Sequence, residues 1–390
     1  MIISKSKIYN SKYFYYLVIL VFFKPGILNY LGSLSNINSF FSILLTITSL
    51  IILFLYLLEK CTTKFMILLT LFLFSICFST IYNGREYKNV IISMIYIFIF
   101  CLFSELGVRH NAKLYLESMF KALSILVIVN FILLLIYPNG LYQTEYYHNE
   151  FHFLATKNGF IAYILPTIVA GQICKKLKSS VSSKYITLVE LISIITIFIT
   201  GSSTSIVGLL MFILLIILLK KHTLGTFINY KSLFITYIFF SFGITVFRIQ
   251  NIFSFFIETI LNKSLNFTGR TDIWDVAIGM IKNAFIIGNG ADFNTGILQI
   301  GNTYYYSHNM LLEILVIGGV VALSLFLIIT YRVGKQLKLR QSSISYILVA
   351  GICSFFIMSI TESYILANGF YLFLILSVNI KNFEKYIQKE

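Results

Sequence analysis

The chain has 390 residues, of which 58% are hydrophobic and only 12% are charged, and this excludes an ordinary water-soluble protein. The formal net charge is +15, from 30 Lys and Arg residues against 15 Asp and Glu residues, and the positive residues gather in the short segments between apolar runs. This distribution argues against a nucleic-acid-binding surface. The composition predicts an all-α integral membrane protein that forms a single polytopic domain over residues 1–390.

Twelve apolar runs long enough to cross a bilayer follow one another along the chain. They span residues 13–32, 39–58, 64–82, 89–107, 114–137, 158–174, 185–201, 204–219, 232–248, 309–331, 343–361 and 363–380. The first run has a basic start but no small-residue cleavage site, so we expect it to be retained as a span. The pattern predicts about 12 transmembrane helices.

The positive charges in the connecting segments predict the orientation of these helices. If the N-terminus is cytoplasmic, the inside segments hold 21 Lys and Arg residues and the outside segments hold 6. Positive residues are retained on the cytoplasmic side of membrane proteins. We therefore expect a multi-pass protein of the cytoplasmic (cell) membrane with both its N- and C-termini in the cytoplasm.

Two outside segments differ from the short basic connections. Residues 138–157 form a second extracytoplasmic loop, and residues 249–308 form one large extracytoplasmic loop. Connections of that length inside a compact protein are usually functional. The larger loop is expected to contain short amphipathic helices, because "TGRTDIWDVAIGMIK" (268–282) has one apolar face. Thr268 or Thr271 is a candidate cap, and Trp274 is expected at the level of the lipid headgroups.

The stretch "YYYSHNMLLEIL" (304–315) places a histidine at the mouth of an apolar run. Asn309 is a good N-cap for that run, so His308 lies just outside the first helical turn. A helix N-terminus disfavours imidazolium and attracts anions. Arg270 stands at the start of the amphipathic helix in the same loop. A guanidinium, a neutral imidazole and unpaired backbone N–H groups together suit a lipid-linked phosphate or pyrophosphate.

Three of these segments resemble the conserved core of the bacterial O-antigen polymerase and O-antigen ligase family. They are "TGR…W" at 268–274, "IIGNG" at 286–290 and "SHNMLLEILVIGGVVALSLFL" at 307–327. The motif resemblance extends over residues 150–330, and the count of helices with one large outside loop is also similar.

Two earlier segments also resemble that family. "TKNGFIAYILP" (156–166) is similar to its Lys-Asn segment, and "TGSSTSIVGLL" (200–210) is similar to its Ser-Arg-rich turn. Many members carry an arginine in that turn, where this chain has Ser203. If that arginine binds phosphate, Arg248 and Lys157 are the cations available to replace it here.

The resemblance implies a metal-independent glycosyltransferase, without a cofactor, that uses an undecaprenyl-pyrophosphate-linked oligosaccharide as donor at the outer membrane face. An acceptor hydroxyl attacks the anomeric carbon of the donor and the lipid pyrophosphate leaves. His308 and Arg270 are then the catalytic candidates, with His308 acting either as base or as a hydrogen-bond donor to phosphate. The candidates for binding pyrophosphate or glycan are Arg248, Lys157, Asn158, Asn309 and Trp274.

Polymerases of this family extend a chain of repeat units, whereas ligases transfer the glycan to lipid A core. Many residues here have A/T-rich codons, which is typical of bacteria that make capsule without lipid A, so a polymerase of capsule polysaccharide or another exopolysaccharide is favoured. A lipid-linked oligosaccharide flippase or other transporter remains the alternative of a different class. The implied partners are the lipid-linked oligosaccharide, membrane lipid, and a chain-length regulator and flippase of the same pathway, with no nucleic acid.

Several polar residues also have a purely structural interpretation. His308 is also explained as a histidine that simply lies at the membrane interface. Arg270 is also explained as a surface arginine whose side chain extends to the lipid headgroups. Asn158 fits a helix cap after Lys157. Glu362 lies at an outside turn, where simple exposure to solvent is expected. His148 and His152 are four residues apart, but a metal site needs a third ligand, so no metal is expected there.

Overall fold

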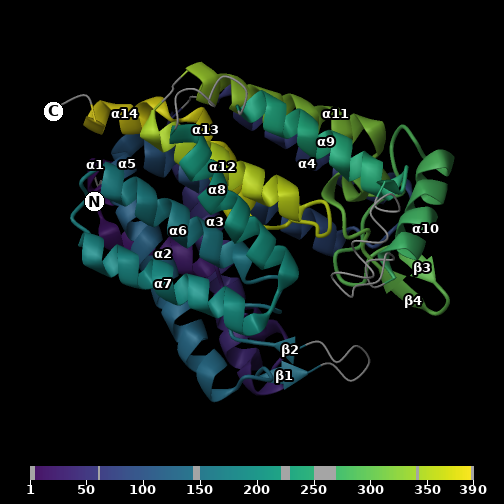
Figure 1. The fold of residues 1–390 in the computed structure, drawn as a ribbon, viewed down its shortest axis with the longest axis horizontal. Helices are drawn as coiled ribbons and strands as arrows, with labels where there is room; N and C mark the ends of the chain where they lie inside the picture. The colour runs from purple at the N-terminus through teal and green to yellow at the C-terminus, as the bar shows by residue number, and fades with distance from the viewer. Residues whose placement is uncertain are drawn as a thin grey trace.

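A computed structural model describes residues 5–59, 62–143, 150–220, 229–249, 269–339 and 342–387. In these ranges the protein is almost entirely helical, and the strands are confined to two short antiparallel hairpins (Figure 1). The prediction of an all-α membrane protein is confirmed. Residues 144–149, which include His148, and residues 250–268, which make up a third of the predicted large loop, lie outside the described residues.

The elements follow the predicted apolar runs closely. In chain order they are α1 (Lys5–Tyr9), α2 (Lys12–Phe22), η1 (Gly26–Asn29), η2 (Gly32–Leu34), α3 (Ser35–Glu59), α4 (Lys64–Tyr82), α5 (Lys88–Ile136), β1 (Tyr142–Gln143), β2 (Glu150–Phe151), α6 (Ile161–Lys176), α7 (Ser183–Thr200), α8 (Ser203–Lys220), α9 (Tyr230–Thr245), α10 (Arg270–Asn283), β3 (Leu298–Ile300), β4 (Thr303–Tyr305), α11 (Met310–Leu339), α12 (Ser343–Met358), α13 (Asn368–Val378) and α14 (Lys381–Ile387).

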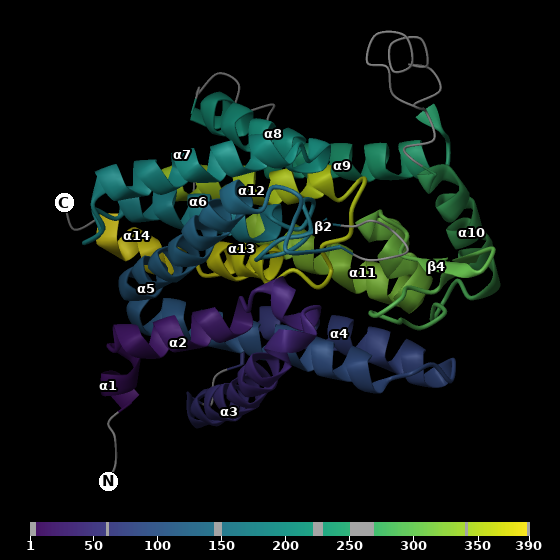
Figure 2. The same ribbon diagram turned by 90° about the horizontal axis from the view of Figure 1, so that it is seen from below.

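Six helices in the described ranges are long and apolar enough to cross a membrane. They are α3 with η2, α4, α5, α7, α8 and α11, and α2, α12 and α13 are shorter apolar helices. Length and composition therefore establish a multi-pass protein, while the count of about twelve spans stays a prediction. Figure 2 shows α7, α8 and α9 along one side of the bundle, α2, α3 and α4 along the opposite side, and α11, α12 and α13 between them.

The 49-residue helix α5 contains two of the predicted runs, and the chain turns between them at Asn111. Asn111 has non-helical backbone angles, and its side chain accepts a hydrogen bond from the N–H of Leu114, which starts the second half. Tyr115 donates to the hydroxyl of Ser104 over 2.9 Å. Residues eleven apart in a straight helix would be separated by about 16 Å along its axis, so this contact requires the two halves to fold back on each other.

The glycine turn 286–290 packs into a kink of α11. Gly319 has φ +64, a conformation that side-chain-bearing residues rarely adopt, and this frees the N–H of Val320 to bond Phe285 O over 2.9 Å. A Cβ at Gly288 would lie 2.5 Å from the backbone nitrogen of Gly319. The turn therefore needs glycine because two backbones touch there, and its role in the structure is packing.

The apolar face of helix α10 packs against the rest of the protein, not against lipid as the amphipathic pattern predicted. It packs against α11 and β3, and Trp274 is fully buried, so the prediction of Trp274 at the headgroup level is wrong. The apolar face of α10 finds the protein core instead of lipid. The helix begins at Arg270 after Gly269, with no side-chain cap, and Thr271 falls inside the first turn, while Thr268 lies outside the described residues.

Both termini lie at one end of the bundle, and α10, β3 and β4 lie at the opposite end (Figure 1). The connection between α12 and α13, residues 359–367, and the residues just before α6 reach the same region as the start of α10, since their side chains are hydrogen-bonded there. The predicted site residues come from these connections.

Candidate functional site

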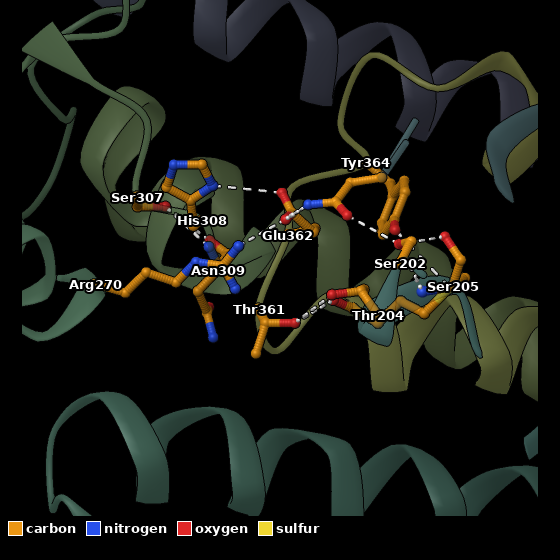
Figure 3. A network of polar contacts seen from close by, with 12 residues as sticks. Ser202, Thr204, Ser205, Arg270, Ser307, His308, Asn309, Thr361, Glu362 and Tyr364 are labelled. Atoms are coloured by element: carbon orange, nitrogen blue, oxygen red, sulfur yellow. Dashed lines mark hydrogen bonds and ion pairs between the residues drawn. The ribbon is translucent and has the colours of Figure 1, made fainter. Parts of the chain in front are cut away.

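A carboxylate, Glu362, stands at the centre of the site. Its Oε1 lies 2.7 Å from Arg270 Nη2, and its Oε2 lies 3.3 Å from His308 Nδ1. The amide of Asn158 donates to Oε1 over 2.9 Å (Figure 3). These four residues come from the start of α10, the connections before α6 and α11, and the connection after α12. The structure thus brings together three of the predicted site residues on an acid that the sequence suggested would be exposed.

Glu362 is in fact largely buried, with 15% of its side chain exposed, so the expectation of simple solvent exposure is wrong. Burial alone would raise its pKa, but the hydrogen bond to His308 and the positive charge of Arg270 outweigh that effect and hold the pKa below its ordinary value. The carboxylate is therefore ionised at neutral pH and orients both basic side chains.

His308 adopts a left-handed backbone conformation, with φ +51. Such a conformation costs about 1–3 kcal/mol in a residue with a side chain, and surrounding contacts must hold it. The N–H of Ser307 donates to Glu313 Oε2 over 2.7 Å, and Trp274 Nε1–H donates to Ser307 O over 2.8 Å. These two bonds fix the residue before His308, and they explain how the imidazole is directed at Glu362.

Asn309 caps α11 as predicted, because its Oδ1 accepts the N–H of Leu312 over 3.0 Å. Its side chain is completely buried, and its amide also donates to Ser241 on α9 and to the backbone oxygen of Ile360. Asn309 thereby joins α9, α11 and the connection that carries Glu362. These hydrogen bonds hold the connection that carries Glu362 in place against α9 and α11.

The hydrogen bond from His308 Nδ1 to the carboxylate has a chemical consequence. A carboxylate accepts the proton of Nδ1, so the other nitrogen, Nε2, carries the lone pair of the neutral ring. The side chain of His308 is 32% exposed, and Figure 3 shows its second nitrogen pointing away from Glu362. Arg270 uses Nη2 for the carboxylate, and in the described part of the chain its Nη1 and Nε have no hydrogen-bond partner. Within the described residues, His308 Nε2 and the N–H groups of Arg270 Nη1 and Nε are therefore without a partner and can meet a ligand.

The remaining predicted cations lie elsewhere. Arg248 follows α9 with φ +53, donates to Thr271 O over 2.9 Å and pairs with Asp275, and its guanidinium faces the Trp274 ring at 5.3 Å. It therefore fastens α10 to the end of α9. Lys157 is exposed and has no hydrogen bond or ion pair within the described ranges. Asn158 does not cap α6, which begins at Ile161 without a side-chain cap.

A serine contact that the sequence did not suggest extends the network to α8. Ser202 donates to Asn158 Oδ1 over 2.8 Å, the hydroxyls of Ser202 and Ser205 lie 2.9 Å apart, and those of Thr204 and Thr361 lie 3.4 Å apart (Figure 3). Ser202, Thr204 and Ser205 lie in the segment 200–210, which resembles a Ser-Arg-rich turn of the family. Ser202 fixes the side chain of Asn158, which in turn orients the carboxylate.

An apolar groove of about 400 Å³ runs between α9, α10 and α11 next to this cluster. Its walls are Phe242, Val246, Ile278, Ile281, Phe285, Leu312 and Leu315, with Lys282 at the rim. Leu312 lies one turn along α11 from His308, and Ile278 lies two turns along α10 from Arg270. The groove therefore lies beside the second half of α10 and the first two turns of α11.

The residues that the structure describes contain no group of three or more His, Cys, Asp or Glu side chains arranged to hold a metal ion. The chemistry available at the site from the protein itself is that of one imidazole, one guanidinium and the carboxylate between them. Such a set binds an anion and moves a proton.

The fold and the site define a helical, multi-pass membrane protein with a cluster of a guanidinium, an imidazole and a shared carboxylate. Residues 188–327 match the family model described as O-antigen ligase (Wzy_C). The matched range runs from α7 into α11 and includes Arg270 and His308. No curated protein and no solved structure matches the chain.

Proposed function

We propose that this protein is a polysaccharide polymerase that joins undecaprenyl-pyrophosphate-linked oligosaccharide repeat units on the outer face of the cytoplasmic membrane. The observation that carries the proposal is the meeting of Arg270 and His308 on Glu362, with an open guanidinium edge and an open imidazole nitrogen. The family match supports a lipid-linked glycan as substrate. The excess of Lys and Arg in the opposite connections supports the outer location.

In the proposed reaction, Arg270 binds the pyrophosphate of the donor. As the bond between the anomeric carbon and the phosphate oxygen breaks, its electron pair goes to the pyrophosphate, whose charge increases. Guanidinium donors that are already in place stabilise this charge without reorganisation. Glu362 holds Arg270 by a single nitrogen, which leaves the other edge of the fork for the leaving group.

His308 is the base in this proposal. Its Nε2 accepts the proton of the acceptor hydroxyl while the hydroxyl oxygen bonds to the anomeric carbon, and the proton is later released to water. The carboxylate on Nδ1 keeps the ring in the correct tautomer and stabilises the imidazolium that forms. The strained backbone of His308 is consistent with a side chain held for a reaction.

The groove between α9, α10 and α11 is suited to the prenyl chain of the donor. It is almost wholly apolar, and it lies beside the second half of α10, which begins at Arg270, and the first two turns of α11, which follows His308. A lipid whose diphosphate lies at Arg270 has its hydrocarbon chain directed along the helices, where this groove offers apolar walls.

A ligase that transfers glycan to lipid A core is the second candidate, since the family contains both activities. A flippase is disfavoured, because a base and a cation that share one carboxylate suit bond formation more than transport. The richness in residues with A/T-rich codons supports the polymerase.

The test uses purified full-length protein in proteoliposomes with a labelled lipid-linked repeat unit as both donor and acceptor. A polymerase produces a ladder of longer glycans, and Arg270→Ala abolishes it. Products that form only when lipid A core is added would indicate a ligase. Label that crosses the bilayer without any lengthening of the glycan would indicate a flippase and overturn the proposal.

A further inference from the structure

A second cavity, of about 230 Å³, opens between the ends of α2, α3, α5 and α13. Its wall includes Lys24, Phe41, Ser42, Tyr96, Leu366 and Asn368. Leu366 belongs to the connection that also carries Glu362, so the cavity lies at the same end of the bundle as the Glu362 cluster. Neither the family resemblance nor the proposed chemistry uses this cavity.

Lys24 is the cation of this cavity. Its Nζ donates to Asn29 Oδ1 over 2.8 Å and to Asn38 Oδ1 over 2.7 Å, and both acceptors are neutral amides. Within the described ranges no carboxylate lies at ion-pairing distance from this ammonium. An ammonium has three N–H donors, so one donor and the full positive charge remain available to a ligand.

The backbone around Lys24 is held firmly in place. Tyr163 on α6 donates to Lys24 O over 3.2 Å, and Asn368 at the start of α13 donates to Phe22 O over 2.8 Å. The backbone at the cation is therefore held by α6 and α13, and the cavity beside it has walls formed by aliphatic and aromatic side chains. A ligand with an anionic head and a hydrocarbon tail satisfies both the charge and the apolar walls.

The cavity and the Glu362 cluster are close in space because they share one connection. Leu366 follows Glu362 by four residues, so their Cα atoms are at most about 14 Å apart. In a polymerase, the reacting hydroxyl of the acceptor belongs to the sugar farthest from its lipid. The acceptor diphosphate must then bind away from His308, at a distance that an oligosaccharide can bridge.

We propose that the Lys24 cavity binds the diphosphate end of the acceptor, a second polyprenyl-diphosphate-linked glycan, while the donor diphosphate lies at Arg270. This inference rests on the proposed function, and it supplies what a polymerase needs and a ligase to lipid A core does not: two sites for the same lipid carrier. Lys24 donates to the acceptor phosphate, and the acceptor glycan extends past Leu366 towards His308.

The experiment measures binding of undecaprenyl diphosphate to the full chain in phosphatidylcholine nanodiscs by native mass spectrometry. Two equivalents are expected for the unaltered protein. Lys24→Glu is expected to lower the affinity for one bound undecaprenyl diphosphate at least about tenfold and to leave the affinity for the other unchanged. Arg270→Ala is expected to weaken the binding of that other molecule and to leave the first unchanged. Lys24→Arg keeps the charge and retains both equivalents. Lys88→Ala, an exposed lysine at the start of α5, is the matched control and also retains both.

A variant that leaves the charge intact guards against a folding artefact. Leu45→Trp fills the cavity, which Leu45 lines, without altering Lys24, and it is expected to remove the same equivalent while the thermal unfolding curve stays close to that of the unaltered protein. A single equivalent that is indifferent to Lys24 and Leu45 would overturn the inference. Equal displacement by a tenfold excess of phosphatidylglycerol would also overturn it, because the cavity would then be a general phospholipid site.

The two proposals fail in different ways. If no glycan is lengthened but two Lys24-dependent and Arg270-dependent equivalents still bind, the polymerase assignment is wrong and the second lipid site stands. If glycans are lengthened and Lys24→Glu leaves the acceptor KM unchanged, the polymerase stands and the acceptor site is elsewhere.

Discussion

Two regions of this molecule contain an arginine, a histidine and glutamate, and only one of them has the form of a reaction site. The Glu362 cluster consists of Asn158, Arg270, His308 and Glu362. The α5 cluster consists of Tyr9, Glu59, Glu105, Arg109 and His110. In the α5 cluster Arg109 pairs with Glu105 one turn away on the same helix, and His110 lies 3.4 Å from its own carboxylate, Glu59.

The difference lies in how the partners are shared and which atoms remain open. In the α5 cluster each basic side chain has a separate acid, and the ring of Tyr9 stacks on His110 at 3.8 Å. In the Glu362 cluster one carboxylate serves Arg270, His308 and the Asn158 amide, so a guanidinium edge and an imidazole nitrogen stay available. Residue types alone therefore do not identify a site, whereas unsatisfied donors and acceptors in a fixed arrangement do.

The largest effect is expected when the proposed base is removed. His308→Ala should lower the rate of glycan elongation about 10²- to 10⁴-fold, the usual contribution of a positioned general base. The measurement is the initial rate in proteoliposomes, normalised to inserted protein. His110→Ala in the α5 cluster removes a histidine that lies against its own carboxylate and under an aromatic ring, and it should keep a rate near that of the unaltered protein. Equal losses of elongation rate in the two variants would contradict the proposed difference between the Glu362 cluster and the α5 cluster.

A smaller loss is expected from Arg270→Lys, which keeps the charge but removes the planar fork. Binding of a diphosphate through two nitrogens should be lost, and the elongation rate should fall about 10- to 100-fold. Arg332→Lys is a matched control, because Arg332 is exposed on α11 far along the helix from the site. An Arg270→Lys protein with full activity would show that a point charge suffices and that bidentate binding is wrong.

Glu362→Gln tests whether the shared carboxylate positions the basic residues. A neutral amide no longer stabilises imidazolium, so kcat should fall about tenfold while KM changes little. A purely structural role would lower the apparent kcat only through loss of folded protein, so a kcat that returns to normal when the rate is divided by the amount of folded protein would contradict the assignment.

The pKa of Glu362 adds a dependence of stability on pH. Because its folded-state pKa lies below the ordinary value of 4.5, the carboxylate stabilises the fold above that pH, and this contribution is lost as the pH falls through the folded-state pKa. Thermal unfolding should therefore separate the unaltered protein from Glu362→Gln at pH 7, with the gap narrowing as the pH is lowered below the ordinary value of 4.5. A gap that is constant over this range would show that charge is not the cause.

The smallest effect is expected from Trp274→Phe, which keeps an aromatic ring in the core but removes the hydrogen bond to Ser307 O. The loss should be about 1 kcal/mol of unfolding free energy, with a few-fold loss of rate because the segment before His308 is held less firmly. Chemical unfolding and the elongation assay measure the two effects. An unchanged elongation rate would show that the reactivity of His308 does not depend on how firmly its strained backbone is held.

The helices were predictable because hydropathy and its period are local properties. Each predicted apolar run falls on a helix, and the cap at Asn309 depends only on the three residues that follow it. The runs at 89–107 and 114–137 merge into one element, α5, which turns at Asn111. The gap between the two apolar runs marks this turn in the sequence. The pairing of Arg270 with His308 was predicted by resemblance and by charge near one helix start, and the structure brings the two side chains onto one acid.

The acid itself could not be found this way. Glu362 is 92 residues from Arg270 and 54 from His308 along the chain, and no local pattern distinguishes a buried carboxylate that joins them from an exposed one in a turn. The contact between Ser202 and Asn158 could not be predicted either, because the two residues are far apart along the chain. The burial of Trp274 was missed because an amphipathic helix has the same sequence whether its apolar face meets lipid or protein.

By itself, the sequence of this protein determined that the chain is helical, crosses the membrane repeatedly and carries its cations in connecting segments, because the free energy of placing apolar and charged groups in lipid depends on each residue in turn. Only the tertiary structure decided which polar side chains meet, since hydrogen bonds and ion pairs act over about 3 Å and depend on how separate helices pack. That packing places Glu362 between Arg270 and His308, buries Trp274 beneath them, and leaves Lys24 without a carboxylate partner in the described part of the chain.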